Sequence, residues 1–76
     1  MTLSATDESI IEKYDYAFRN DIIDSELKFL YKKLSPEGLT ELKKLVIFYM
    51  NENKDENIPL CNRCESLLES IKMYAK

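Results

Sequence analysis

LSPEGLTELKKLVIFYM, residues 34–50, is the stretch of this 76-residue sequence that decides the fold. Ser35 is a favourable N-cap, and Pro36 suits the first helical position, where the amide has no intrahelical partner in any case. Proline also disfavours helical geometry at the residue before it, so a preceding helix ends at Ser35. The stretch predicts a helix over residues 36–51 that meets the preceding helix at a tight corner.

This predicted helix is apolar on more than one face. One stripe holds Leu39, Leu42, Leu45, Val46 and Tyr49. The run LVIFYM, residues 45–50, adds consecutive apolar side chains, more than packing on one side can bury. Two explanations stay open. Either other helices surround this one, or Ile47, Phe48 or Met50 contacts a partner or a second copy of the chain.

Apolar residues at helical spacing predict three further helices. The first covers about residues 7–19 with Thr6 or Asp7 as its cap, the second covers about 22–34, and the last begins near the cysteines and ends at about Tyr74. The predicted stripes are Ile10, Ile11, Tyr14, Ala17 and Phe18 in the first helix, Ile23, Leu27, Leu30, Tyr31 and Leu34 in the second, and Cys64, Leu67, Leu68, Ile71 and Tyr74 in the last.

The composition agrees with a helical protein. The chain is 45% hydrophobic and has only one glycine and two prolines, so few positions suit turns and most residues belong in regular structure. We therefore expect an all-α fold, a single helical domain over residues 1–76 with three to four short helices. A chain of this length is near the lower limit for a self-sufficient core, so dimerisation is a second way to complete the bundle.

Charge and residue usage exclude several classes of function. The formal charge of −3 opposes a nucleic-acid interface and direct binding to an anionic membrane. No apolar run approaches the roughly 20 residues of a membrane span, and the N-terminal sequence lacks the features of a secretory signal, so we expect a cytoplasmic protein. The chain has no histidine, which removes the commonest general base, and we expect no enzyme.

The only two cysteines, Cys61 and Cys64, have C-x-x-C spacing, and three explanations stay open. We expect no cofactor, but the two thiolates suit a zinc or iron site, whose other two ligands would be carboxylates or the same two thiolates of a second chain. Alternatively, the pair could exchange thiol for disulfide. In the third explanation Asn62 caps the last helix, Glu65 completes a capping box, and Cys64 is a small buried apolar residue.

Residues 30–53, LYKKLSPEGLTELKKLVIFYMNEN, resemble a helical segment of phage-type repressors from low-GC Gram-positive bacteria. In those proteins the segment follows the DNA-binding domain. The resemblance rests on Leu34, Glu37, Gly38, Leu39, Leu42 and the cluster from Val46 to Tyr49. It implies a role in dimerisation or partner contact and an origin in phage or another mobile element. The basic helix-turn-helix of such repressors is absent here.

These features predict a small acidic module for protein–protein interaction that acts as a regulator, inhibitor or adaptor and self-associates. The expected contact residues are Ile47, Phe48 and Met50, together with Tyr16, an aromatic residue outside the first stripe. The alternative is a homodimer bridged by zinc, or a thiol redox module, that uses Cys61 and Cys64.

Overall fold

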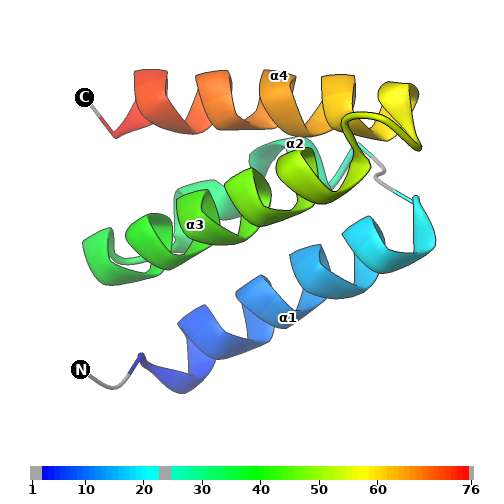
Figure 1. Ribbon diagram of the computed structural model, residues 1–76. Helices are drawn as coiled ribbons and strands as arrows, with labels where there is room; N and C mark the ends of the chain where they lie inside the picture. Colours follow the sequence, from blue (N-terminus) through cyan, green and yellow to red (C-terminus); the bar gives the residue numbers. More distant parts are fainter. Residues whose placement is uncertain (1–2, 23–24, 76) are drawn as a thin grey trace.

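Helix α3, Pro36–Asn53, begins where the sequence predicts and runs slightly further (Figure 1). In the computed structural model, which describes residues 3–22 and 25–75, Pro36 is the first residue of this helix. The Ser35 hydroxyl accepts a hydrogen bond from the Gly38 N–H at 3.2 Å. The local signals at this corner therefore act as expected.

The other helices surround α3 on three sides. Helix α1, Ala5–Asn20, and helix α4, Ile58–Tyr74, both pack against it, and the short helix α2, Leu27–Leu30, lies behind it in the view of Figure 1. Helices α3 and α4 are antiparallel, and both ends of the chain lie at the same end of the bundle. The prediction of a small all-α bundle is confirmed.

One apolar core joins these helices, and it includes most of the predicted stripe residues. Its buried members are Ile10, Tyr14, Ala17, Phe18, Leu27, Leu30, Tyr31, Leu34, Leu39, Leu42, Val46, Leu60, Cys64, Leu67, Leu68 and Ile71. Ile11, Leu45 and Tyr49 are only partly buried, and Tyr74 is exposed. Ile23 lies outside the described residues. Helical periodicity therefore identifies the core well but not its margin.

Helix α1 begins earlier than predicted, because Ser4 and not Thr6 or Asp7 is its N-cap. The Ser4 hydroxyl accepts a hydrogen bond from the Asp7 N–H at 3.1 Å, and the Asp7 side chain is buried at the start of α3. One Asp7 oxygen accepts the Ser35 N–H at 3.1 Å, and the other accepts the Ser35 hydroxyl. These bonds from Ser35, the hydroxyl first, hold the pKa of Asp7 below its ordinary value.

The predicted continuous helix over residues 22–34 is wrong, since α2 gives way to a 3-10 turn, η1, Tyr31–Lys33. The buried Tyr14 hydroxyl donates to the Leu27 carbonyl and accepts the Tyr31 N–H at 2.9 Å. In an α-helix that N–H and that carbonyl would bond directly. A side chain inserted into the backbone ladder is a known cause of helix distortion, and Tyr14 supplies it here.

Helix α4 begins at Ile58, so Asn62 is not its cap as predicted. The N-cap is Asn57, whose side-chain oxygen accepts the Leu60 N–H at 3.2 Å, and Pro59 lies in the first turn. This start repeats the pattern of a polar cap followed by proline seen at α3. Both cysteines consequently lie inside the helix.

Candidate interaction surfaces

The apolar run in α3 is divided between core and surface. Val46 is completely buried, whereas Ile47 is 44% exposed and Phe48 is 55% exposed. Leu45, Tyr49 and Met50 are partly buried against the core. Of the four predicted contact residues, Ile47 and Phe48 therefore lie on the outside of α3, and Met50 lies at the margin of the core.

Contacts with the bundle fix the position of Phe48. Its ring meets the Tyr49 ring edge-on, with centroids 5.2 Å apart, and Tyr49 packs in turn on Phe18 at 5.3 Å. The Tyr49 hydroxyl donates to the Asp15 carboxylate at 2.6 Å. Burial, and then this hydrogen bond, raises the pKa of Tyr49 to about 12, so the hydroxyl keeps its proton near neutral pH. Phe48 thus rests on a supported aromatic ring although it is exposed.

Charged side chains flank Phe48 along the helix. Lys44, Phe48 and Glu52 follow one another at intervals of four residues, so they share one side of α3. All three are exposed, and Lys44 makes only a surface ion pair with Glu41 at 3.4 Å. We call Lys44, Ile47, Phe48 and Glu52 the α3 face. It combines an apolar centre with one positive and one negative end.

Tyr16 lies on α1 in a different surface depression. It is 57% exposed and lines a shallow hollow of about 390 Å³ together with the exposed Ile22. The residues that line this hollow come from α1 and the segment before and within α2, not from α3. The structure therefore does not bring Tyr16 together with Ile47 and Phe48.

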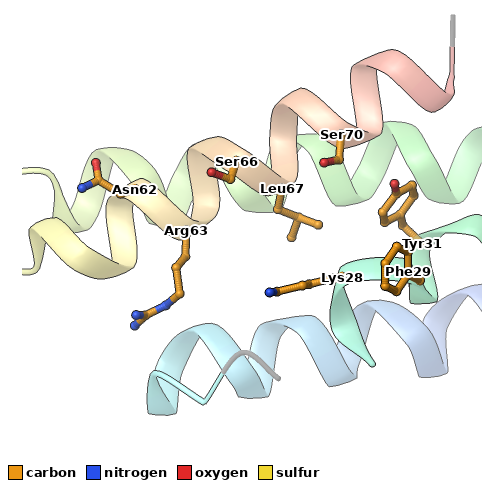
Figure 2. Close-up of a pocket in the computed structure, with 8 residues that line it drawn as sticks. All are labelled: Lys28, Phe29, Tyr31, Asn62, Arg63, Ser66, Leu67 and Ser70. Atoms are coloured by element: carbon orange, nitrogen blue, oxygen red, sulfur yellow. The ribbon is translucent and has the colours of Figure 1, made fainter. Parts of the chain in front are cut away.

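A groove between α2 and α4 was not predicted from the sequence (Figure 2). It encloses about 480 Å³, within the usual range for binding pockets. We call it the α2–α4 groove, and its lining residues are Lys28, Phe29, Tyr31, Asn62, Arg63, Ser66, Leu67 and Ser70. One signal pointed to it: Phe29 falls outside the apolar stripe of its segment, yet it is a large aromatic residue.

The two cations that line this groove, Lys28 and Arg63, differ in their ion pairing. Arg63 pairs with the carboxylate of Asp21, the left-handed residue that ends α1. Lys28 makes no ion pair within the described part of the chain, and its side chain extends along the groove between α2 and α4 (Figure 2). Lys32 does not line the groove, but it lies over the ring of the lining residue Phe29, 5.3 Å from its centroid. The α2 side of the groove is therefore positively charged.

The two cysteines occupy different environments within α4. Cys64 is completely buried and Cys61 is partly exposed. Burial, and secondarily the neighbouring Cys61, raises the pKa of Cys64 to about 11, so its thiol stays protonated near neutral pH. The position of Cys64 favours the explanation in which it is a buried apolar residue. In the described ranges, no three cysteine or carboxylate side chains are placed to hold a metal ion.

Comparisons with protein-family models, curated proteins and solved structures give no significant match to this chain. Among the residues that the structure describes, no helix has the length and apolar character to cross a membrane. The α3 face and the α2–α4 groove are therefore the two features of this structure that bear on function.

Proposed function

We propose that this protein is a small module for protein–protein interaction that forms a homodimer through the α3 face. The observation that carries the proposal is the exposure of Ile47 and Phe48, two large apolar side chains that are adjacent in the sequence and lie in the C-terminal half of α3. Covering exposed apolar groups of this size with a partner lowers the free energy and so favours association.

The charges beside Phe48 favour a second copy as the partner. In an antiparallel pair of α3 helices with a twofold axis at Phe48, each residue four positions before Phe48 meets the residue four positions after it in the other chain. Lys44 then lies against the partner's Glu52, and the reverse contact is identical by symmetry. The same surface on both chains is thus complementary to itself in charge.

The resemblance of residues 30–53 to repressor segments that serve dimerisation supports the same proposal. We assign the dimer a regulatory, inhibitory or adaptor role of mobile-element origin, without catalysis, nucleic-acid binding or membrane binding. The net charge of −3 and the absence of histidine support these exclusions. A cytoplasmic location completes the proposal, since the chain carries free cysteines and no disulfide framework.

Sedimentation velocity over a range of protein concentrations tests the proposal. One helix face is smaller than a standard interface, so we expect a dimer with a micromolar dissociation constant. Phe48→Glu places a charge at the twofold axis and should give a monomer at all concentrations. Because Phe48 is exposed, the variant should keep its helical circular dichroism. Phe29→Glu is the matched control, since Phe29 is 61% exposed on α2, and it should still dimerise.

A charge exchange tests the proposed pairing directly. Lys44→Glu and Glu52→Lys should each weaken the dimer about fivefold, because each places like charges opposite one another. The double variant Lys44→Glu/Glu52→Lys should restore the wild-type dissociation constant. If wild-type protein is monomeric at millimolar concentration, the proposed dimer is refuted. If the losses of dimer affinity in the two single variants instead add together in the double variant, the antiparallel arrangement is refuted.

A further inference from the structure

The α2–α4 groove has two chemically different ends, which Figure 2 shows clearly. Phe29 and Tyr31 lie at one end, on α2 and η1, with Leu67 of α4 beside them. The amino group of Lys28 and the guanidinium of Arg63 lie towards the other end. A ligand that fits this groove therefore needs an apolar part next to a negatively charged part.

The charge of the groove is opposite to that of the whole chain. Two cations and no carboxylate line it, whereas the protein has 14 acidic and 11 basic residues. Asp21 already pairs with Arg63, which leaves Lys28 as the cation without a carboxylate in the described ranges. An amino group without a carboxylate partner can form a charge-assisted hydrogen bond with an anionic group of a ligand, and such bonds are stronger than neutral ones.

One wall of the groove offers regularly spaced hydrogen-bonding groups. Asn62, Ser66 and Ser70 follow one another at intervals of four residues along α4. Such positions are about 6 Å apart on a helix, close to the roughly 6.6 Å between alternate residues of an extended peptide. Glu65 and Glu69 lie on the outer side of this row, so a ligand's carboxylates are directed towards α2.

We propose that the α2–α4 groove binds an extended acidic segment of another protein. A large apolar side chain of that segment packs against Phe29 and Leu67, and a neighbouring carboxylate pairs with Lys28. The polar row on α4 binds the segment's backbone. This inference names a partner for the interaction role proposed above and rests on it, but it uses a surface separate from the α3 face.

Two pools of fluorescein-labelled decapeptides test the inference by fluorescence anisotropy. The first pool contains Asp, Glu, Leu and Phe at every position, and the second contains Asn and Gln in place of the acids. We expect the acidic pool to bind at protein concentrations below 500 µM and the amide pool to bind at least tenfold more weakly. Binding of the acidic pool should weaken several-fold between 50 and 300 mM NaCl. Equal binding of both pools, or no binding of the acidic pool, overturns the inference.

Variants locate the binding site. Lys28→Glu should weaken binding of the acidic pool at least tenfold, whereas Lys13→Glu, with the same change in net charge on α1, should change it less than twofold. Phe29→Ala should weaken it about fivefold, and Phe48→Ala should have no effect. Because Lys28, Phe29 and Lys13 are exposed, these variants should fold as wild type does. An equal effect of Lys28→Glu and Lys13→Glu overturns the inference.

Other occupants give distinct results. If free octanoate binds the groove as tightly as the acidic pool does, the site is one for small carboxylates and the peptide proposal is overturned. If Lys28→Glu abolishes the dimer seen by sedimentation, the occupant is a second copy of this chain, and the proposal is again overturned. Failure of the α3 dimer is read from sedimentation of the wild-type protein and of Phe48→Glu, a measurement that does not depend on peptide binding in the groove.

Discussion

Replacement of Tyr14 by phenylalanine should destabilise the protein although it removes only one oxygen atom. The Tyr14 hydroxyl lies between α1 and α2, where it donates to the Leu27 carbonyl and accepts the Tyr31 N–H. The residue is completely buried, and burial raises the pKa of its hydroxyl above the ordinary value, so it remains a hydrogen-bond donor. Phenylalanine fills the same space, which isolates the effect of the two hydrogen bonds.

The expected loss is about 2 kcal/mol of unfolding free energy, from two buried hydrogen bonds that each contribute about 1 kcal/mol. A permanently unsatisfied Tyr31 N–H would add to this loss. In the variant, however, that N–H can approach the Leu27 carbonyl as in a regular helix, which recovers part of it. A domain of this length has a total stability of roughly 4–11 kcal/mol, so the loss is a large fraction. The melting temperature should fall by about 10 °C.

Guanidinium chloride unfolding, followed by circular dichroism at 222 nm, measures this loss. Tyr16→Phe is the matched control, because the Tyr16 hydroxyl makes no hydrogen bond within the described part of the chain, and its stability should change by less than about 0.5 kcal/mol. The slope of the unfolding free energy against guanidinium concentration should be the same for both variants as for the wild type. Equal stability of Tyr14→Phe and Tyr16→Phe would refute a stabilising role for the two hydrogen bonds of Tyr14.

Three further predictions concern the start of α3 and the cysteines. The folded-state pKa of Asp7 lies below its unfolded value, so the carboxylate stabilises the fold at pH values above the unfolded pKa. This contribution is lost as the pH falls through the folded pKa. The urea midpoints at pH 5 and pH 2 should therefore differ less for Asp7→Asn than for the wild type. Gly38→Ala should lower the unfolding free energy by about 1 kcal/mol, against the usual helix preference, because a Cβ would lie 2.9 Å from atoms of both Asp7 and Leu34; a gain in stability would contradict this close contact. Ellman's reagent should label Cys61 but not Cys64 in native protein and both in denaturant, and rapid native labelling of a Cys61→Ser variant would refute the burial of Cys64.

The parts of the fold that depend on neighbouring residues in the sequence could be predicted. Ser35 and Pro36 determine the start of α3 through contacts within one turn, so the corner before it was predicted correctly. The same type of signal is present at Asn57 and Pro59, but the later Asn62 and Glu65 also match a capping box, which led to the wrong prediction for the start of α4. Local patterns thus identify possible caps, and the surrounding packing determines which one is used.

The errors in α1 and α2 come from contacts between residues far apart in the chain. Asp7 is an ordinary first-turn acid in the sequence, but its carboxylate binds Ser35 at the start of another helix. Tyr14 fits the apolar stripe of α1, yet its hydroxyl enters the backbone of α2. Periodicity describes which face of a helix is apolar and carries no information about such partners.

For the candidate surfaces, too, the sequence indicates the types of residue and the fold determines where they lie. The run at residues 45–50 indicates that some apolar side chains must be exposed, and only the packing of α3 shows that these are Ile47 and Phe48. The α2–α4 groove brings together residues 28–31 and residues 62–70, which no local pattern connects. Its polar row and the unusual position of Phe29 are visible in the sequence, but their common location is a property of the fold.

Three tyrosine hydroxyls link the helical segments of the bundle to one another. Tyr14, Tyr49 and Tyr74 each donate a hydrogen bond to another helical segment, with acceptors at the Leu27 carbonyl, the Asp15 carboxylate and the Lys32 carbonyl. Two of these acceptors belong to α2 and η1, which are too short to be stable as isolated helices. The wall of the groove that carries Lys28 and Phe29 is therefore held in place by side chains of α1 and α4. It follows that Tyr14→Phe should weaken binding of the acidic peptide pool more than it weakens the α3 dimer, because the α3 face makes no contact with the Tyr14 hydroxyl.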